Sequence, residues 1–152
     1  MLDLTAFFSN PDILDTIPSE KTTYQANSLI LSEDDNGQDL YLILSGEAEV
    51  CCNLHDDEYH QPARVAHLRA NDIFGELSLF ESGPRTAEVK ALTDCEVLKL
   101  NGPALTAYLD TRPADGYFVL KELFLRLIVR MRQNNMRTKM ALQMYFHEHA
   151  DD

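Results

Sequence analysis

Hydrophobic and polar residues alternate in short runs through the first hundred residues of the chain, and a helical pattern replaces them afterwards. Alternation with a period of two, bounded by turn-forming residues, is typical of half-buried β-strands. Turn-prone clusters such as EDDNGQD and NLHDDEYHQP separate the runs. The pattern therefore predicts an antiparallel barrel or roll between about Lys21 and Leu100, with strands at residues 29–31, 40–44, 48–52, 64–68, 87–91 and 95–100.

Helices are predicted on both sides of this roll. Residues 4–8 and 11–17 have short helical patterns before it, and residues 102–109 have another directly after it. Pro113 then stands where a proline starts a helix well, because the first helical N–H has no acceptor within the helix. No later proline interrupts the chain, so one long helix is expected to about Phe146.

The long helix is expected to carry a heptad seam on one face. Its positions recur at alternating steps of four and three, and polar residues at core positions would set the register. A helix of about 30 residues at 1.5 Å each is about 45 Å long, more than one small roll can cover. We therefore expect a homodimer through this helix, and the alternative is an ordinary buried helix with a frayed end. The seam comprises Leu120, Phe124, Leu127, Met131, Asn134, Thr138, Ala141 and Tyr145.

Length and composition indicate one domain. The 152 residues suffice for a single core and contain no internal repeat, low-complexity tract or linker. The N-terminus carries acids and a proline where a signal peptide needs a basic start, and no stretch has the roughly 18 apolar residues of a membrane span. Three cysteines without a C-x-x-C spacing fit a reducing compartment. We expect a soluble cytoplasmic protein that does not bind a membrane.

Charge is distributed unevenly along the chain. The net charge is −12, and residues 1–111 hold 6 basic and 20 acidic residues, whereas residues 112–152 hold 7 and 5. The acidic part would repel a nucleic-acid backbone, since affinity for nucleic acid depends on Lys and Arg contacts with phosphates. We therefore predict no direct nucleic-acid partner. The basic stretch from Arg126 to Lys139 is interpreted as flanks of the seam, facing an acidic roll or solvent.

One segment, FGELSLFESGPRTAEVKA at residues 74–91, combines the groups that a sugar phosphate requires. A turn of helix beginning near Gly75 would present backbone N–H groups to an anion. Arg85 would add a bidentate, charge-assisted grip on phosphate oxygens. Glu76 would repel a phosphate but could accept a hydrogen bond from a sugar hydroxyl. Taken singly, Glu76 could cap a helix and Arg85 could form a surface ion pair, but their combination in this string favours a ligand site.

The string FGELSLF-x-x-G-PRTA-x-V-x-A resembles the phosphate-binding cassette of the cyclic nucleotide-binding domains. These domains occur in protein kinase A regulatory subunits, cyclic-nucleotide-gated channels and bacterial catabolite activator proteins. The resemblance extends to DLYLILSG at residues 39–46, to NDIFGE at residues 71–76 and to the long terminal helix. It therefore covers nearly the whole chain.

The resemblance implies a role for each cassette residue. Glu76 would bind the ribose 2′-hydroxyl with help from the backbone of Gly75, and Arg85 would hold the cyclic phosphate. Backbone N–H groups would assist the arginine at Ser78, Thr86 and Ala87. The implied ligand is cAMP or cGMP. A threonine after the arginine occurs in binders of either nucleotide, so Thr86 does not decide the base, and a cyclic dinucleotide stays open.

The resemblance also implies an α+β fold and a domain plan. An antiparallel β-roll, a double-stranded β-helix of jelly-roll type, would be flanked by N-terminal helices and a long C-terminal helix. A single cyclic nucleotide-binding domain would span residues 1–152. Its parts would be a helical piece at 1–20, the roll at 21–100 with the cassette at 74–91, and the B and C helices at 101–148. Where the family often has turn glycines, this chain has Asn27, Asp34 and Asn71, residue types that tolerate a left-handed backbone.

The terminal helix is expected to read the base and carry the output. Asn134 and Asn135 lie where the RMRQNN stretch resembles the part of the bacterial helix that touches the purine, and an amide offers both a donor and an acceptor. A register-setting role for Asn134 in the seam is the alternative. The catabolite activators continue into a helix-turn-helix, whereas this chain stops at Asp152. We therefore expect that it acts on a separate effector protein or is part of a longer protein.

Other functions find less support in the sequence. No Ser-His-Asp, Cys-His or paired-carboxylate arrangement has a catalytic context, so we expect no enzyme activity. A cupin-like metal site would use His55, His60 and His67, but their spacing lacks the H-x-H pair that such a site needs, so no metal is expected. A scaffolding dimer that kept the fold and lost its ligand is the main alternative to a cyclic nucleotide sensor.

Overall fold

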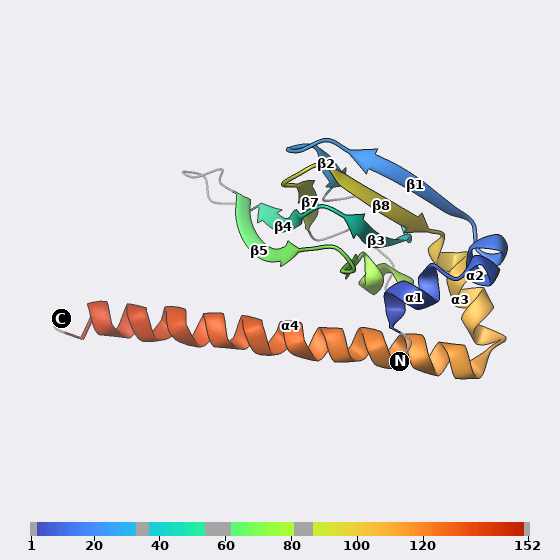
Figure 1. Ribbon diagram of the computed structural model, residues 1–152. Coiled ribbons are helices and arrows are strands. Elements are labelled where there is room, and N and C mark those ends of the chain that lie inside the picture. Colours follow the sequence, from blue (N-terminus) through green and yellow to red (C-terminus); the bar gives the residue numbers. More distant parts are fainter. Residues whose placement is uncertain (1–2, 33–36, 54–61, 81–86, 151–152) are drawn as a thin grey trace. The chain divides into compact units, whose positions relative to one another are not determined.

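Two four-stranded antiparallel sheets form the β-roll that the sequence pattern predicts (Figure 1). The structure, a computed structural model, describes residues 3–32, 37–53, 62–80 and 87–150. One sheet has the order β1-β8-β3-β6, with strands Ser19–Tyr24, Cys95–Leu100, Leu40–Ser45 and Ile73–Phe74. The other has the order β2-β7-β4-β5, with strands Leu29–Leu31, Glu88–Ala91, Ala48–Asn53 and Pro62–Leu68. The predicted α+β fold is thus confirmed.

In the residues that the structure describes, four α-helices and one 3₁₀ helix accompany the sheets. They are α1 (Leu4–Phe8), α2 (Pro11–Thr16), η1 (Glu76–Leu79), α3 (Gly102–Asp110) and α4 (Pro113–Glu148). Side chains that cap backbone N–H groups start the short helices, because the first N–H groups have no partner within a helix. Asp3 accepts from the N–H of Ala6 at 2.7 Å, and Asn101 accepts from that of Ala104 at 2.9 Å. The chain divides into two compact units, residues 1–112 and residues 113–152, which are described separately.

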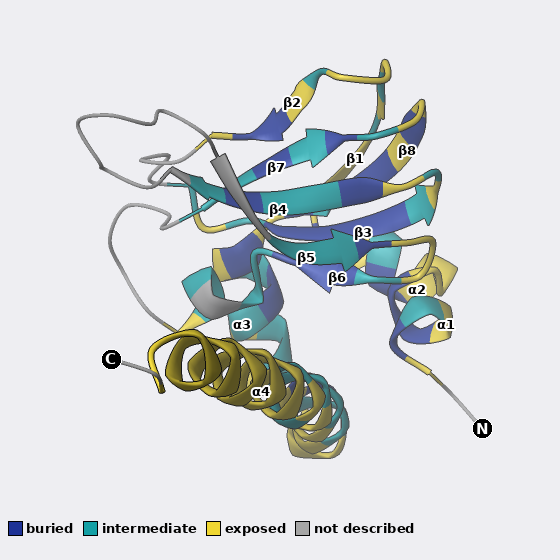
Figure 2. Ribbon diagram, turned by 90° about the vertical axis from the view of Figure 1, so that its left-hand side faces the viewer, coloured by how far each residue is buried: buried dark blue, intermediate teal, exposed yellow. Residues whose placement is uncertain are grey.

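The core of the roll lies between the two sheets. Its members come from seven strands and bury aromatic, aliphatic and thiol side chains: Ile30, Leu31, Tyr41, Ile43, Ala48, Leu68, Phe74, Val89, Ala91, Cys95 and Val97. Residues on one strand alternate between its two faces. Leu40 and Leu42 therefore point to the opposite face of the first sheet from Tyr41 and Ile43, and they too are fully buried. Strands β3 and β8 are accordingly buried over much of their length (Figure 2).

Three turns are tied together by hydrogen bonds at one end of the roll. The N–H of Glu47 donates to the hydroxyl of Thr93 at 3.0 Å, and the carbonyl of Glu47 accepts from the N–H of Thr93 at 3.3 Å. The N–H of Ala26 donates to the carboxylate of Asp94 at 2.9 Å. Gly46 has a φ of +94°, and a Cβ there would lie 2.3 Å from the carbonyl oxygen of Asp94. These contacts fix the three turns to one another and require a glycine at position 46.

Two strands of the first sheet were not predicted. Strand β1 pairs along its whole length with β8, from Ser19 with Leu100 to Tyr24 with Cys95, and the expected start of the roll at residue 21 falls inside it. Strand β6 has only two residues and lies outside the predicted strands. The expected left-handed turns are confirmed at Asn27, with a φ of 70°, and at Asn71, with a φ of 75°. Asp34 lies outside the described residues.

Helix α4 has 36 residues and begins at Pro113, as predicted. Within it, Val119 and Leu123 are buried, whereas seven of the eight expected seam residues are exposed and Leu127 is half-buried. Residues 131–150 of α4 are all exposed in the single chain. The dimer seam and the alternative of a buried helix with a frayed end both stay predictions. None of the helices in the described parts of the chain is long and apolar enough to cross a membrane.

Candidate functional site

Strand β6 leads directly into the segment that the sequence marks as the cassette. Phe74, the last residue of β6, is paired with Tyr41 on β3, and Ile73 is paired with Leu42. The rings of Tyr41 and Phe74 are stacked, with centroids 4.9 Å apart and planes 5° from parallel. Offset stacking of buried aromatic rings adds stability beyond the area that they bury. The entry to the cassette is thus fixed to the roll.

The loop before β6 is tied to β3 as well. The N–H of Asn71 donates to the carbonyl of Ile43 at 2.8 Å, and the N–H of Ile43 donates to the carbonyl of Asp72 at 3.0 Å. The side chain of Asp72 accepts from the N–H of Arg69 at 2.8 Å. Because Asn71 adopts the left-handed conformation, the chain can reverse here and enter β6 in register.

Gly75 turns the chain from β6 into η1. Its φ of +80° lies in the left-handed region, which favours glycine. Glu76 follows as the first residue of η1, and the N–H of Ser78 donates to the carbonyl of Gly75 at 3.2 Å. The predicted short helix near Gly75 is confirmed as a single 3₁₀ turn. Such a short turn has little macrodipole, so an anion would depend on individual N–H groups and on Arg85.

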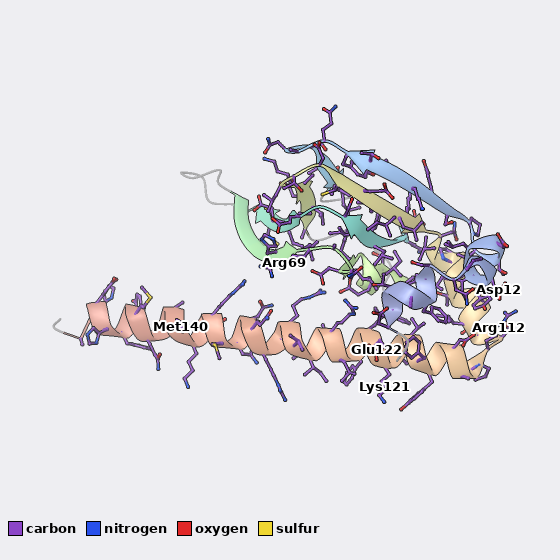
Figure 3. All side chains as sticks on the ribbon, viewed as in Figure 1. Asp12, Arg69, Arg112, Lys121, Glu122 and Met140 are labelled. Atoms are coloured by element: carbon purple, nitrogen blue, oxygen red, sulfur yellow. The ribbon has the colours of Figure 1, made fainter. Side chains whose placement is uncertain are left out.

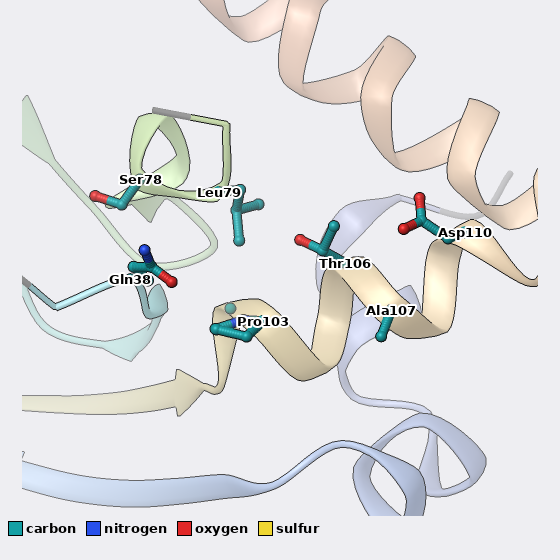
Figure 4. A pocket seen from close by; sticks show the side chains of 8 residues that line it. Gln38, Ser78, Leu79, Pro103, Thr106, Ala107 and Asp110 are labelled. Carbon is teal, nitrogen blue, oxygen red and sulfur yellow. The ribbon is translucent and has the colours of Figure 1, made fainter. Parts of the chain in front are cut away.

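Helix η1 contacts β3 and α3. A hollow of about 310 Å³ lies where η1 meets α3, lined by Gln38, Ser78, Leu79, Gly102, Pro103, Thr106, Ala107 and Asp110 (Figure 4). At the start of α3, a Cβ on Gly102 would lie 1.7 Å from the carbonyl oxygen of Gln38 and 3.1 Å from Cδ2 of Leu79. The end of the cassette helix, the approach to β3 and the first turn of α3 therefore meet at one glycine.

The structure places the predicted site residues as follows. Gly75, Glu76 and Ser78 lie together on one turn, and Glu76 and Ser78 are half-buried. Ala87 is half-buried and stands directly before β7, the strand between β2 and β4. Asn134 and Asn135 are exposed residues of α4, in the second unit. Arg85 and Thr86 lie outside the described residues.

Sequence reasoning did not single out the Tyr41–Phe74 stack or the close approach at Gly102. Tyr41 and Phe74 each stand in one of the strings that resemble the family, DLYLILSG and NDIFGE, so their pairing could have been suspected from those strings. Gly102 carries no such signal, because only the folded chain brings Gln38 beside it.

The metal-site hypothesis concerns three histidines. His67 lies on β5, with its Nε2 3.7 Å from a carboxylate oxygen of Glu47, the residue directly before β4. No group of three metal-binding side chains occurs among the residues that the structure describes. His55 and His60 lie outside those residues.

Comparisons with known proteins concern most of the chain. The family model for the cyclic nucleotide-binding domain matches residues 21–112. The chain is 29% identical over 107 residues to the CRP-like cAMP-activated global transcriptional regulator of Mycobacterium tuberculosis, covering 70% of this chain and 46% of that protein. It is 33% identical over 109 residues to the cAMP-dependent protein kinase regulatory subunit of Colletotrichum orbiculare, covering 72% of this chain and 25% of that protein. It thus spans less than half the length of these relatives.

A solved structure shows the same relationship. The catabolite activator protein of Thermus thermophilus resembles the chain with a TM-score of 0.67 and 26% identity, over 88% of this chain and 60% of that one. The matched region 21–112 contains the turn at Gly75, η1 and all described strands of the roll except the first two residues of β1. The chain therefore belongs to the cyclic nucleotide-binding domain family.

Proposed function

We propose that the chain is a sensor of a 3′,5′-cyclic mononucleotide, cAMP or cGMP, that regulates a partner protein and has no enzyme activity of its own. The observation that carries the proposal is the left-handed turn at Gly75, which sets Glu76 at the start of η1 within the matched family region. The names of the two relatives, one cAMP-activated and one cAMP-dependent, favour cAMP. The whole of residues 1–152 would act as one such domain.

Within this function, each cassette residue has a proposed role. The carboxylate of Glu76 accepts a hydrogen bond from the ribose 2′-hydroxyl, and the backbone of Gly75 supports it. Arg85 binds the cyclic phosphate, and N–H groups of Thr86 and Ala87 assist. Because the N–H of Ser78 already donates to Gly75, the hydroxyl of Ser78 is the better candidate for a contact to phosphate.

Helix α4 has two proposed roles. Asn134 and Asn135 contact the purine, and the heptad seam joins two copies of the chain in a homodimer. The exposure of Phe124, at 59%, and of Leu120, Met131 and Tyr145 supports dimerisation, since a cluster of exposed large apolar side chains marks an interaction site. Ligand binding would shift the equilibrium between two arrangements of α4, and a separate effector protein would respond to that shift.

Titration calorimetry on the intact protein tests ligand binding, with cAMP, cGMP and a cyclic dinucleotide as the three ligands. We expect cAMP to bind with the highest affinity and Arg85→Ala to remove most of it, because a charge-assisted bidentate contact is lost. Arg69→Ala is the matched control, since it removes an exposed arginine outside the cassette. The absence of heat from all three ligands at roughly millimolar concentration, where a Kd of 1 mM corresponds to about −4 kcal/mol, would reject the sensor.

Sedimentation measures the proposed homodimer separately. Leu120→Glu combined with Phe124→Glu should give a monomer, because like charges would face each other across the seam. Lys121→Glu is the control, since it adds the same side chain off the seam. A dimer that persists without any effect of ligand on thermal unfolding would favour the scaffolding alternative.

A further inference from the structure

Helix α4 carries a second apolar stripe that the heptad seam does not include. Leu125, Val129, Met136, Met140 and Met144 follow one another at steps of four, seven, four and four, which is the spacing of one helix face. All five side chains are exposed, Met136 to 65% and Met144 to 64%. We call these five residues the methionine stripe.

The methionine stripe and the seam lie on opposite sides of α4. Val129 and Met136 each stand two residues before a seam residue, Met131 and Thr138 respectively. At 3.6 residues per turn, a step of two residues rotates by about 200° around the axis. One partner helix cannot cover both faces, so a homodimer through the seam would leave the stripe exposed.

The C-terminal part of the stripe lies beside an open groove between side chains of α4 itself. Met140, Gln143, Met144, His147 and Glu148 line this groove. Side chains project from α4 in all directions over this part of the helix (Figure 3). Methionine is unbranched, flexible and polarizable, so a surface rich in methionine adapts to apolar side chains of a partner.

Basic residues flank the stripe, and acids are absent from this part of the helix. Residues 123–147 contain five basic residues and no Asp or Glu, although the chain as a whole has a net charge of −12. Arg132 and Lys139 border the stripe on one side by helical spacing, and no acid stands three or four residues from either of them. A partner that fits this surface must therefore combine an apolar ridge with negative flanks.

We infer that the methionine stripe docks an acidic amphipathic helix of a separate protein. The partner helix would place apolar side chains on the stripe at i, i+3, i+4 and i+7, and its Asp or Glu flanks would face Arg132 and Lys139. This inference names the class of effector through which the proposed sensor acts, and its regulatory meaning rests on that function.

A second copy of the chain fits this surface less well than an acidic helix does. Pairing two stripes would bring two segments with five basic residues each together, and like charges oppose such a contact. In the described part of the first unit, the exposed large apolar side chains are Leu29 and Phe80, which do not form a ridge. An anionic membrane would attract the basic stretch at residues 123–147 but repel the rest of the chain, which holds 25 acids against 8 basic residues.

Binding of two labelled synthetic peptides to the full chain tests the inference by fluorescence anisotropy. Both peptides are helices of roughly four heptads with leucine at a and d, one with Glu and the other with Lys at e and g. We expect the acidic peptide to bind and the basic one not to bind. Binding should weaken as salt is added, because the flanking contacts are exposed ion pairs.

Matched variants assign the binding to the stripe. Met136→Gln with Met140→Gln should lower the affinity for the acidic peptide by about tenfold or more, because the central apolar contacts carry most of the energy of such an interface. Arg132→Gln with Lys139→Gln should weaken it and flatten the salt dependence. Met131→Gln, the same change on the seam, should leave the affinity unchanged. Glutamine favours the helix nearly as well as methionine does, so α4 should keep its helicity.

Several results would overturn the inference. They are equal binding of both peptides, no binding of the acidic peptide, or an equal loss with Met131→Gln. A wild-type assembly larger than a dimer that Met136→Gln with Met140→Gln reduces to a dimer would assign the stripe to a second copy. If the wild-type chain floats with phosphatidylserine vesicles and the same double variant does not, the methionine stripe would be assigned to membrane binding. Calorimetry with cAMP on each variant separates these outcomes from a failure of the sensor function.

Discussion

Tyr41 and Phe74 face each other across the β3–β6 pair, with their ring planes only 5° from parallel. Gly75 and Glu76 follow Phe74 without an intervening residue. The stack therefore determines where η1 begins, and with it where the carboxylate of Glu76 lies. A disturbance of these two rings should affect both the stability of the roll and the affinity for a cyclic nucleotide.

Phe74→Ala is expected to lower the free energy of unfolding by about 3–5 kcal/mol, the usual cost of truncating a buried aromatic side chain. Phe74 is only 4% exposed, and the truncation would also remove the stack with Tyr41. Urea unfolding measures the change. Phe80→Ala is the matched control, since Phe80 is 66% exposed and its loss should change the stability by less than about 0.5 kcal/mol. Equal effects of the two variants would contradict the role of the stack.

Gly75→Ala is expected to cost about 1–2 kcal/mol, because an alanine at a φ of +80° brings its Cβ close to the backbone. The nucleotide affinity should fall in parallel, since the turn into η1 would relax. Asn71→Gly serves as the reciprocal control. It places a glycine, which tolerates the left-handed conformation, at a φ of 75° and should change the stability by less than about 1 kcal/mol. A Gly75→Ala protein with unchanged thermal unfolding and unchanged calorimetry would show that this turn is not strained.

Gly102→Ala should destabilise the protein although alanine favours a helix over glycine by roughly 1 kcal/mol, because the new Cβ would lie 1.7 Å from the carbonyl oxygen of Gln38. The start of α3 or the approach to β3 must then move. Thermal unfolding is the measurement. Gly116→Ala, the same substitution inside α4, should leave the stability unchanged or raise it by about 0.5–1 kcal/mol. A stable Gly102→Ala variant would mean that the close approach adjusts at low cost.

The thiol of Cys51 should react slowly, because burial in the first place and the nearby carboxylate of Glu49 in the second raise its pKa from 9.0 to about 11. The native state then holds a proton that the unfolded state loses, so the stability should fall as the pH rises from 9 towards 11. Reaction with a disulfide reagent at pH 8 should begin at half-buried Cys52. A fast reaction that survives Cys52→Ser and disappears in Cys51→Ser would contradict this assignment.

The sequence pattern predicted the elements that bury one face. Strands Leu29–Leu31 and Cys95–Leu100 have the expected bounds, and α4 begins at Pro113, because apolar alternation and a proline at the first helical position are strong local signals. The left-handed turns at Asn27 and Asn71 were also predictable, since few residue types tolerate that conformation.

The elements that sequence reasoning missed have weak local signals. Strand β1, SEKTTY, is mostly exposed and, among the described strands, pairs with β8 alone. Its strand conformation therefore comes from a partner about 75 residues away rather than from its own alternation. Strand β6 is too short to show any period. For the candidate site, the string at residues 74–76 predicted the glycine turn and the acid, whereas the contact between Gly102 and Gln38 depends on the folded chain.

The three turns that Glu47, Thr93 and Asp94 tie together bear on protein engineering. Tolerance of an insertion depends on how far the local backbone is buried and hydrogen-bonded, not on its distance from the ligand site. A fluorescent reporter spliced after Gly46, or new chain ends created between Thr93 and Asp94, would sever contacts among all three turns. These three turns are thus a poor place for circular permutation.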